Sequence, residues 1–402
     1  MMPDVTLELD RRMARARAWD DVLADIRRLD GFADFLRPPR LADLLPAAAG
    51  GPVVVINVGS GRCDALIVRV DGVEVLNLPD LRKGDVFDQV GRYLTALGAP
   101  PADRDLRPRY EPGTEPDALA DITAWMWDAF AERILDHLDG PDQRVWWCPT
   151  GVLSLLPVHA AGHHDIPGAA VIDRVVSSYT PTLRALRDAR RPDNEHSASK
   201  HTSSNAARML VVALPEPPGQ APLPFVRDEV ALLAEAFPGT TRTELGGTAA
   251  TRAAVLHELG RHAWVHFSCH GSQDLDDPSS GGLELYDGSL TIADLSRHAH
   301  RNEFAFLSAC KTATGGANLP DEAITLAAAL HFTGFRHVIA TLWSVGDRTA
   351  AEVAAAVYQD LAAGGTLHPD RSAIALHRAV RALRRRSGRD LAAWIPFVHI
   401  GP

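Results

Sequence analysis

The sequence predicts an α/β protein whose mostly parallel sheet is covered by helices on both faces. Short apolar runs of the buried-strand kind alternate along the chain with segments of helical periodicity. The alternation starts near residue 52 and is interrupted by one polar, aperiodic stretch around residues 190–206. Because strands that alternate with helices pair in parallel, two such series predict a layered sheet in two halves.

The composition is that of a packed globular protein without a strong positive field. Of the 402 residues 46% are hydrophobic, and the net charge is −10, which argues against nucleic acid and anionic membranes as partners. Four cysteines without a repeating spacing predict no disulfide framework and favour a cytoplasmic setting. Neither a signal peptide nor an apolar run of about 18 residues is found. The frequent Ala, Arg and Asp residues suggest a bacterial host.

The first half of the sheet is expected in residues 49–189, after a helical N-terminal segment, residues 1–48. In that segment apolar residues recur at helical spacing until Pro38 and Pro39 end it. From residue 52 the period changes to that of strands. The expected strands are 53–58, 65–70 and 144–149, and the expected helices are 87–97 and 116–138.

A second half is expected in residues 207–402, after a polar linker at 190–206. Apolar runs and helical patterns again alternate there. An arginine-rich helix at 371–389 is interpreted as a solvated face rather than a site for an acidic partner. The expected strands are 209–214, 263–269, 304–309 and 337–342, and the expected helices are 227–237, 321–332 and 349–361.

Two of these strands finish in reactive side chains, His270 and Cys310. The carboxyl ends of parallel strands line the crevice where ligands bind, so these residues are expected to face one cleft. An imidazole can take the proton of a thiol and later give it to a leaving amine. Gly271 lets a substrate approach its N–H closely, and this N–H and that of Cys310 are the candidate oxyanion donors.

Strand alternation separates these residues from their neighbours. His266, Ser268 and His270 share one face, whereas Cys269 points to the other. Cys269 is therefore expected in a helix-covered core, and His266 as a core histidine with a hydrogen-bond partner. A zinc site built from His266, Cys269, His270 and Cys310 is disfavoured, since adjacent Cys269 and His270 point in opposite directions. Neither a metal nor a cofactor is expected.

Six sequence blocks follow one another in the second half of the chain. They are VHFSCHG at 265–271, LELYDGSL at 283–290, FLSACKT at 306–312, DEA at 321–323, GFRHVIATLW at 334–343 and WIPFVHIG at 394–401. In this order they resemble the CHAT domain family, a caspase-like and separase-like module of cysteine peptidases. Upstream segments at 51–54, 62–67 and 154–162 are also similar, so the resemblance runs from about residue 50 to the end. No tetratricopeptide repeat is recognisable before these segments.

The resemblance implies a caspase-haemoglobinase fold with a pseudo-protease half at 49–189 and an active half at 207–402. It also implies that Cys310 is the nucleophile and His270 its acid/base partner. The histidine block has Ser268 where alanine is usual. The separation 310 − 270 = 40 and the flanking residues differ from those of caspases, so aspartate specificity is not assumed.

The function expected from these residues is a cysteine endopeptidase that acts on a protein or peptide substrate and is regulated by a protein partner or a ligand. A catalytically silent interaction scaffold and an amidase or transpeptidase on small molecules remain alternatives. Asp347 and Trp343 follow the strand at 337–342 and are candidates for the substrate pocket. A carboxylate there would favour a basic residue, a tryptophan a large apolar one. As an alternative, Asp347 caps the next helix.

Overall fold

The computed structural model describes residues 5–33, 35–98, 117–138, 143–190, 208–236, 241–272, 280–297, 302–308, 326–343, 345–362 and 368–402. The chain divides into two units, residues 1–44 and residues 45–402. The first unit contains helix α1 (Val5–Arg27) and the short helix α2 (Leu41–Leu44). Between them Arg27 Nε donates to the carbonyl of Phe35 at 2.9 Å. The division falls four residues before the predicted boundary at 48.

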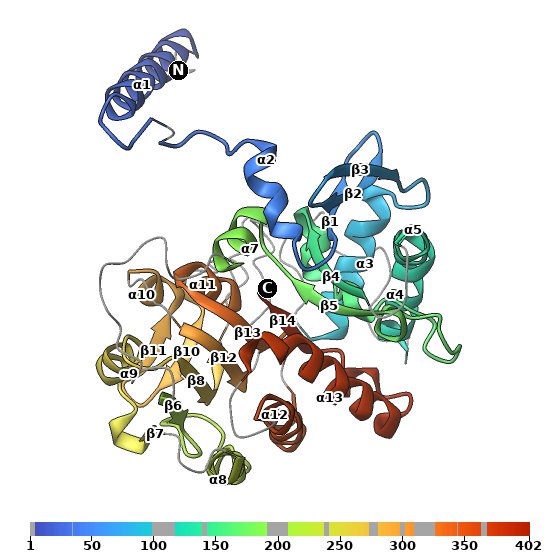
Figure 1. The fold of residues 1–402 in the computed structure, drawn as a ribbon, viewed down its shortest axis with the longest axis vertical. Helices are drawn as coiled ribbons and strands as arrows, with labels where there is room; N and C mark the ends of the chain where they lie inside the picture. The colour runs from blue at the N-terminus through green and yellow to red at the C-terminus, as the bar shows by residue number, and fades with distance from the viewer. Residues whose placement is uncertain are drawn as a thin grey trace. The chain divides into compact units, whose positions relative to one another are not determined.

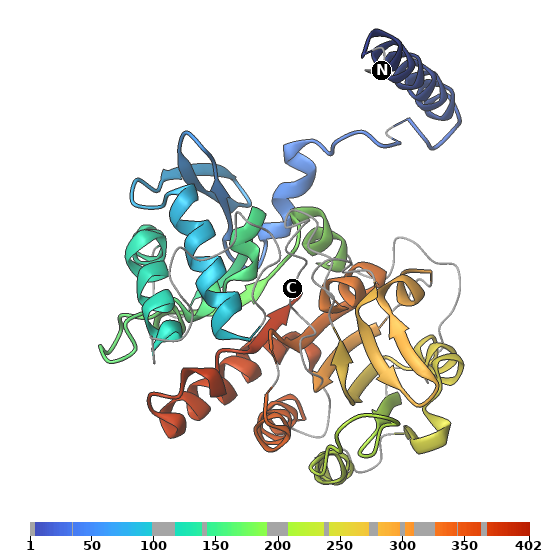
Figure 2. The same ribbon diagram turned by 180° about the vertical axis from the view of Figure 1, so that it is seen from behind.

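The second unit is built on one large sheet (Figures 1 and 2). Within the described residues eleven strands follow the order β3-β2-β1-β4-β5-β14-β13-β12-β8-β6-β7. The pairings are parallel except β1 with β2, β2 with β3 and β13 with β14. The strands are β1 (Val53–Val58), β2 (Cys63–Arg69), β3 (Gly72–Asn77), β4 (Gln143–Pro149), β5 (Val175–Tyr179), β6 (Arg208–Ala213), β7 (Thr241–Gly246), β8 (Trp264–Ser268), β12 (Asn302–Ser308), β13 (Phe335–Thr341) and β14 (Phe397–Ile400).

Helices connect the strands, and a small second sheet follows β8. That sheet has the order β11-β10-β9, with β9 (Gly271–Ser272), β10 (Gly282–Leu285) and β11 (Gly288–Thr291). The α-helices are α3 (Lys83–Ala96), α4 (Ala118–Met126), α5 (Glu132–His137), α6 (Val171–Arg174), α7 (Leu183–Arg190), α8 (Val226–Ala236), α9 (Arg252–Leu259), α10 (Ile292–Ser296), α11 (Leu326–Thr333), α12 (Asp347–Leu361) and α13 (Ser372–Ser387). Single turns are η1 (Leu45–Ala48), the π-helical η3 (Trp127–Ala131), η4 (Gly151–Leu155), η5 (Val158–Ala160), η7 (Gly247–Ala249), η10 (Pro369–Arg371) and η11 (Leu391–Ala393).

The core lies on both faces of the large sheet, as the period of two along each strand requires. Along β8, Trp264 belongs to the cluster under α8, α12 and α13, whereas Val265 and Phe267 belong to the cluster under α9, α10 and α11. Complete burial of a side chain such as Phe267 stabilises the fold by about 1.5–3 kcal/mol. The predicted mostly parallel sheet with helices on both faces is confirmed.

The closing strand β14 joins the two series of elements. It lies between β5 and β13, parallel to β5 through the pair Ile400 and Tyr179 and antiparallel to β13. This placement was not predicted from the sequence, and neither were the strands β3, β5 and β7. The predicted linker at 190–206 falls, apart from Arg190 at the end of α7, outside the described residues. The half-boundaries therefore stay predictions.

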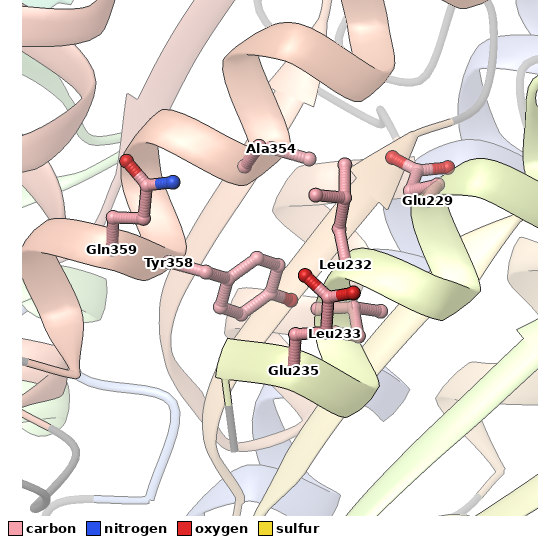
Figure 3. A pocket seen from close by; sticks show the side chains of 8 residues that line it. Glu229, Leu232, Leu233, Glu235, Ala354, Tyr358 and Gln359 are labelled. Carbon is pink, nitrogen blue, oxygen red and sulfur yellow. The ribbon is translucent and has the colours of Figure 1, made fainter. Parts of the chain in front are cut away.

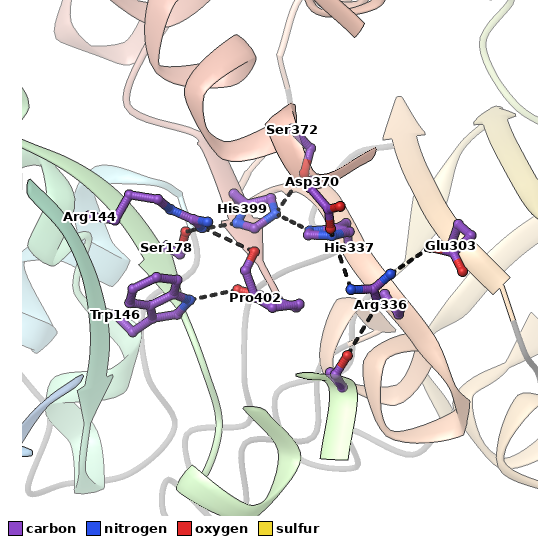
Figure 4. Close-up of polar contacts among 12 residues, drawn as sticks. Arg144, Trp146, Ser178, Glu303, Arg336, His337, Asp370, Ser372, His399 and Pro402 are labelled. Atoms are coloured by element: carbon purple, nitrogen blue, oxygen red, sulfur yellow. Dashed lines mark hydrogen bonds and ion pairs between the residues drawn. The ribbon is translucent and has the colours of Figure 1, made fainter. Parts of the chain in front are cut away.

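A polar network around β14 runs from buried side chains to Asp370, which is exposed (Figure 4). His399 of β14 contacts Ser178 of β5 through Nδ1 at 2.9 Å, and its Nε2 lies 3.2 Å from Nδ1 of His337 on β13. His337 Nε2 contacts Asp370 at 3.2 Å, and that hydrogen bond is the main cause that lowers the pKa of Asp370. Burial lowers the pKa of His337 and His399, so both rings are neutral near pH 7. These contacts link β14 to β5 through Ser178 and to β13 through His337.

Candidate active site

Strands β8 and β12, which the sequence predicts to carry His270 and Cys310, are parallel neighbours. Their register pairs Ser268 with Ser308, the last residue of each strand. His270 follows Ser268 by two residues and is half-buried. Cys310 follows Ser308 by two residues in the sequence and lies outside the described residues. The predicted adjacency of the two strands is confirmed, whereas the contact between the two side chains stays a prediction.

The ring of His270 is held by a backbone carbonyl. Its Nε2 lies 2.8 Å from the carbonyl oxygen of Ala221, in the loop between β6 and α8. Because a carbonyl can only accept, this contact assigns the proton to Nε2. In the neutral ring Nδ1 then carries a lone pair and can accept a proton. Ala221 was not predicted, since a backbone carbonyl leaves no signature in the sequence.

The backbone at His270 passes directly into the small sheet. Its carbonyl oxygen accepts from the N–H of Glu284 at 2.9 Å, and Gly271 pairs with Leu283 of β10. The end of β8 is therefore held by the large sheet on one side and by the small sheet on the other. Gly271, the predicted oxyanion donor, directly follows His270 in β9, and its role stays a prediction.

On the same face of β8 a carboxylate lies below His270. Glu229 of α8 is 3% exposed and accepts a hydrogen bond from the hydroxyl of Ser268. The other oxygen of Glu229 lies 3.3 Å from Nε2 of His266, and Nδ1 of His266 lies 3.1 Å from the hydroxyl of Tyr358 on α12. His266 is fully buried, which confirms the predicted core histidine. Cys269 is 1% exposed in the opposite cluster, which confirms its predicted place.

A groove between α8 and α12 reaches this carboxylate (Figure 3). The cavity measures about 210 Å³. Its floor includes Glu229 and Tyr358, and its rim includes the exposed side chains of Glu235 and Gln359. Glu229 was not predicted from the sequence, because acidic residues in the first turn of an amphipathic helix, here Asp228 and Glu229, are ordinarily solvated.

The two candidates for the substrate pocket lie at the end of β13 and the start of α12. Trp343 is 7% exposed, and its ring meets that of Tyr93 edge to face at 6.0 Å between centroids. Helix α12 begins at Asp347 and has Gly346 at its N-cap. The alternative in which Asp347 is itself the N-cap of this helix is therefore wrong. The place of both residues in a substrate pocket stays a prediction.

The remaining candidates are metal-ligand side chains and the other cysteines. Among the described residues no group of three or more His, Cys, Asp or Glu side chains is arranged to hold a metal ion. The side chains of Cys63, Cys148 and Cys269 are buried. Burial raises the pKa of Cys148 to about 12, which leaves its thiol protonated and unreactive near pH 7. In the part of the chain that the structure describes, no helix has the length and hydropathy of a membrane span.

Comparison with known proteins agrees with the fold. The family model described as CHAT domain matches residues 120–402. No curated protein matches the chain. Two structures of the Saccharomyces cerevisiae separase–securin complex align with a TM-score of 0.52 at 10% and 9% identity. They cover 90% and 89% of this chain but only 30% of the separase-complex chain. The arginine-specific cysteine proteinase gingipain R aligns with a TM-score of 0.44 at 14% identity, covering 79% of this chain and 74% of its own.

Proposed function

The chain belongs to the CHAT domain family, and from this premise we propose that it is a cysteine endopeptidase that cleaves a specific protein partner. Cys310 is the nucleophile and His270 the acid/base residue. One observation carries the proposal: the register of β8 and β12 pairs Ser268 with Ser308, and the two reactive residues follow these serines by the same two positions. Parallel strands bring such positions to one edge of the sheet.

The chemistry follows from the ring orientation of His270. With Nε2–H donated to Ala221, Nδ1 takes the thiol proton of Cys310, and the thiolate attacks the substrate carbonyl. The backbone N–H groups of Gly271 and Cys310 stabilise the oxyanion. His270 returns the proton to the leaving amine, and an acyl-enzyme remains. Water then attacks the acyl-enzyme, giving up its proton to Nδ1, and the thiol is regained when the intermediate collapses.

A protein regulator fits the same proposal. Separase, to which the fold is similar, was crystallised as a complex with securin. We propose that this chain is likewise switched by a bound partner or by its N-terminal segment, rather than by cleavage between residues 311 and 336, which lie mostly outside the described residues. An interaction scaffold without activity is the competing function, and an amidase acting on small molecules is the third.

The test compares the wild-type protein with Cys310→Ala and His270→Ala on a protein library, with new N-termini read by mass spectrometry. Wild-type protein is expected to generate discrete new N-termini, and both variants none, because each loses a reacting group. Cys269→Ala is the matched control and should retain cleavage. Conversion of small amides alone would favour the amidase, and no conversion at all with partner binding intact would favour the scaffold.

The same cleavage products report specificity. Asp347 predicts a basic residue before the scissile bond through charge-assisted hydrogen bonds, and Trp343 a large apolar one. A dominant aspartate at that position would contradict both. If the Asp347→Ala variant still prefers a basic residue before the scissile bond, Asp347 does not line the substrate pocket.

A further inference from the structure

The buried side chains below His270 form one directional chain of contacts. Burial and the nearby Glu229 carboxylate raise the pKa of Tyr358 well above its usual value, so its hydroxyl stays protonated, 3.1 Å from Nδ1 of His266. Nε2 of His266 faces one oxygen of Glu229 at 3.3 Å, a close electrostatic contact outside hydrogen-bond alignment, which favours the tautomer with the proton on Nε2. Ser268 donates to the other oxygen. Glu229 thus accepts a hydrogen bond from Ser268 and lies beside the ring of His266, two side chains of β8.

A buried carboxylate is costly unless it is paired, so this contact fixes α8 against β8. A buried donor left without its acceptor destabilises the folded state. Removal of Glu229 would leave the Ser268 hydroxyl without its acceptor and His266 Nε2 without the carboxylate beside it. These contacts therefore favour a single position of α8 along β8.

The segment that carries Glu229 also carries the carbonyl that holds His270. Ala221 lies eight residues before Glu229, in the loop that enters α8. The first helical bond of Glu229 runs to the carbonyl of Phe225 at 3.0 Å, and the guanidinium of Arg348 lies 5.2 Å from the Phe225 ring centroid. One short segment thus contacts β8 at its two ends, through Glu229 at Ser268 and through Ala221 at His270.

We propose that Glu229 is a positioning residue for His270. By holding Ser268 and His266 it places the loop before α8, and that loop keeps the Ala221 carbonyl on Nε2 and so selects the tautomer with a free Nδ1. The inference rests on the proposed function, since it gives this tautomer the role of the base. It is a statement about geometry, however, and can be measured without any substrate.

The direct measurement is the tautomer of His270. Protein labelled with ¹⁵N in its histidines gives ring nitrogen shifts that distinguish protonated from unprotonated nitrogen, and a His270→Gln spectrum identifies the signals. In the wild-type protein at pH 7.5 we expect a single tautomer with Nε2 protonated. In Glu229→Ala we expect a mixture, because the carbonyl of Ala221 is displaced.

Three variants separate positioning from a merely structural role. Glu229→Gln keeps the length of the side chain and its hydrogen bond with Ser268, since the serine hydroxyl can turn to accept from the amide, and should retain the wild-type tautomer. Ser268→Ala removes one hydroxyl without adding bulk. If Glu229→Ala does not fold, the His270 tautomer is measured in Ser268→Ala instead. Glu235→Ala is the matched control on the same helix, with an exposed side chain outside the network.

On a cleaved peptide, kcat should fall roughly tenfold to a hundredfold in Glu229→Ala with little change in KM, because a misplacement of about 1 Å can cost that much. The proposal would be overturned if a folded Glu229→Ala variant kept the wild-type tautomer and the wild-type kcat. If Glu229→Ala does not fold, the same result in Ser268→Ala would overturn it. So would a mixed tautomer in the wild-type protein. Absence of any cleavage by the wild-type protein would refute the proposed function instead, and the tautomer spectra would still decide the role of Glu229.

Discussion

Two buried histidines should make the fold sensitive to mild acid. His159 is 7% exposed and is held between the hydroxyl of Tyr179 at 2.8 Å and the carbonyl of Ile395 at 2.9 Å. His331 is 5% exposed and contacts the carbonyl of Phe335 at 3.0 Å. Burial lowers the pKa of each ring to about 4, from an ordinary value of about 6.5.

The sign and size follow from proton linkage. Between pH 4 and 6.5 the unfolded chain binds protons that the folded chain does not. The contribution of these two histidines to the free energy of unfolding is therefore complete above about pH 6.5 and is lost as the pH falls towards 4. At pH 5 the unfolded pKa lies 1.5 units above the pH, which corresponds to about 2 kcal/mol for each histidine. Together the two histidines lower the free energy of unfolding at pH 5 by about 4 kcal/mol, a large part of the ~5–15 kcal/mol typical of a folded domain.

The assay is urea unfolding followed by tryptophan fluorescence at pH 7.5 and pH 5. His159→Gln should be destabilised at pH 7.5 but should lose about 2 kcal/mol less than the wild-type protein between the two pH values. His257→Gln is the control, because the side chain of His257 is 65% exposed and its removal should leave the pH dependence unchanged. An unaltered pH dependence in His159→Gln would refute the reasoning.

Two further expectations concern packing. A Cβ on Gly401 would lie 2.1 Å from the carbonyl oxygen of Arg336, at a φ of +131° that favours glycine, so Gly401→Ala should lower the melting temperature by several degrees, whereas Gly84→Ala, whose Cβ meets open space, should change it little. Cys63, Cys148 and Cys269 should resist iodoacetamide in the folded protein because they are buried, and mass spectrometry that finds Cys269 labelled while Cys310 is spared would contradict both the burial and the proposed nucleophile.

Features that depend on local periodicity could be predicted from the sequence. The alternation along β8 assigned His266 and Cys269 to opposite cores before any tertiary contact was known, because the strand period of two is a property of the backbone. Abrupt changes in hydropathy predicted that two strands finish at His270 and Cys310, and β8 ends at Ser268 and β12 at Ser308, each two residues earlier. The mostly parallel sheet followed from the alternation of elements, and the CHAT family from ordered sequence blocks.

Features that depend on distant pairing could be decided only by the tertiary structure. β14 pairs with β5 at Ile400 and Tyr179, far apart in sequence, and no local pattern encodes such a partner. Edge strand β7 is largely polar, since it needs no second buried face. Glu229 reads as an ordinary surface acid in the sequence, and Ala221 contributes only a carbonyl that every residue possesses. Both act at His270 because folding brings α8 and its preceding loop against β8, which is a property of the packed chain rather than of any segment of it.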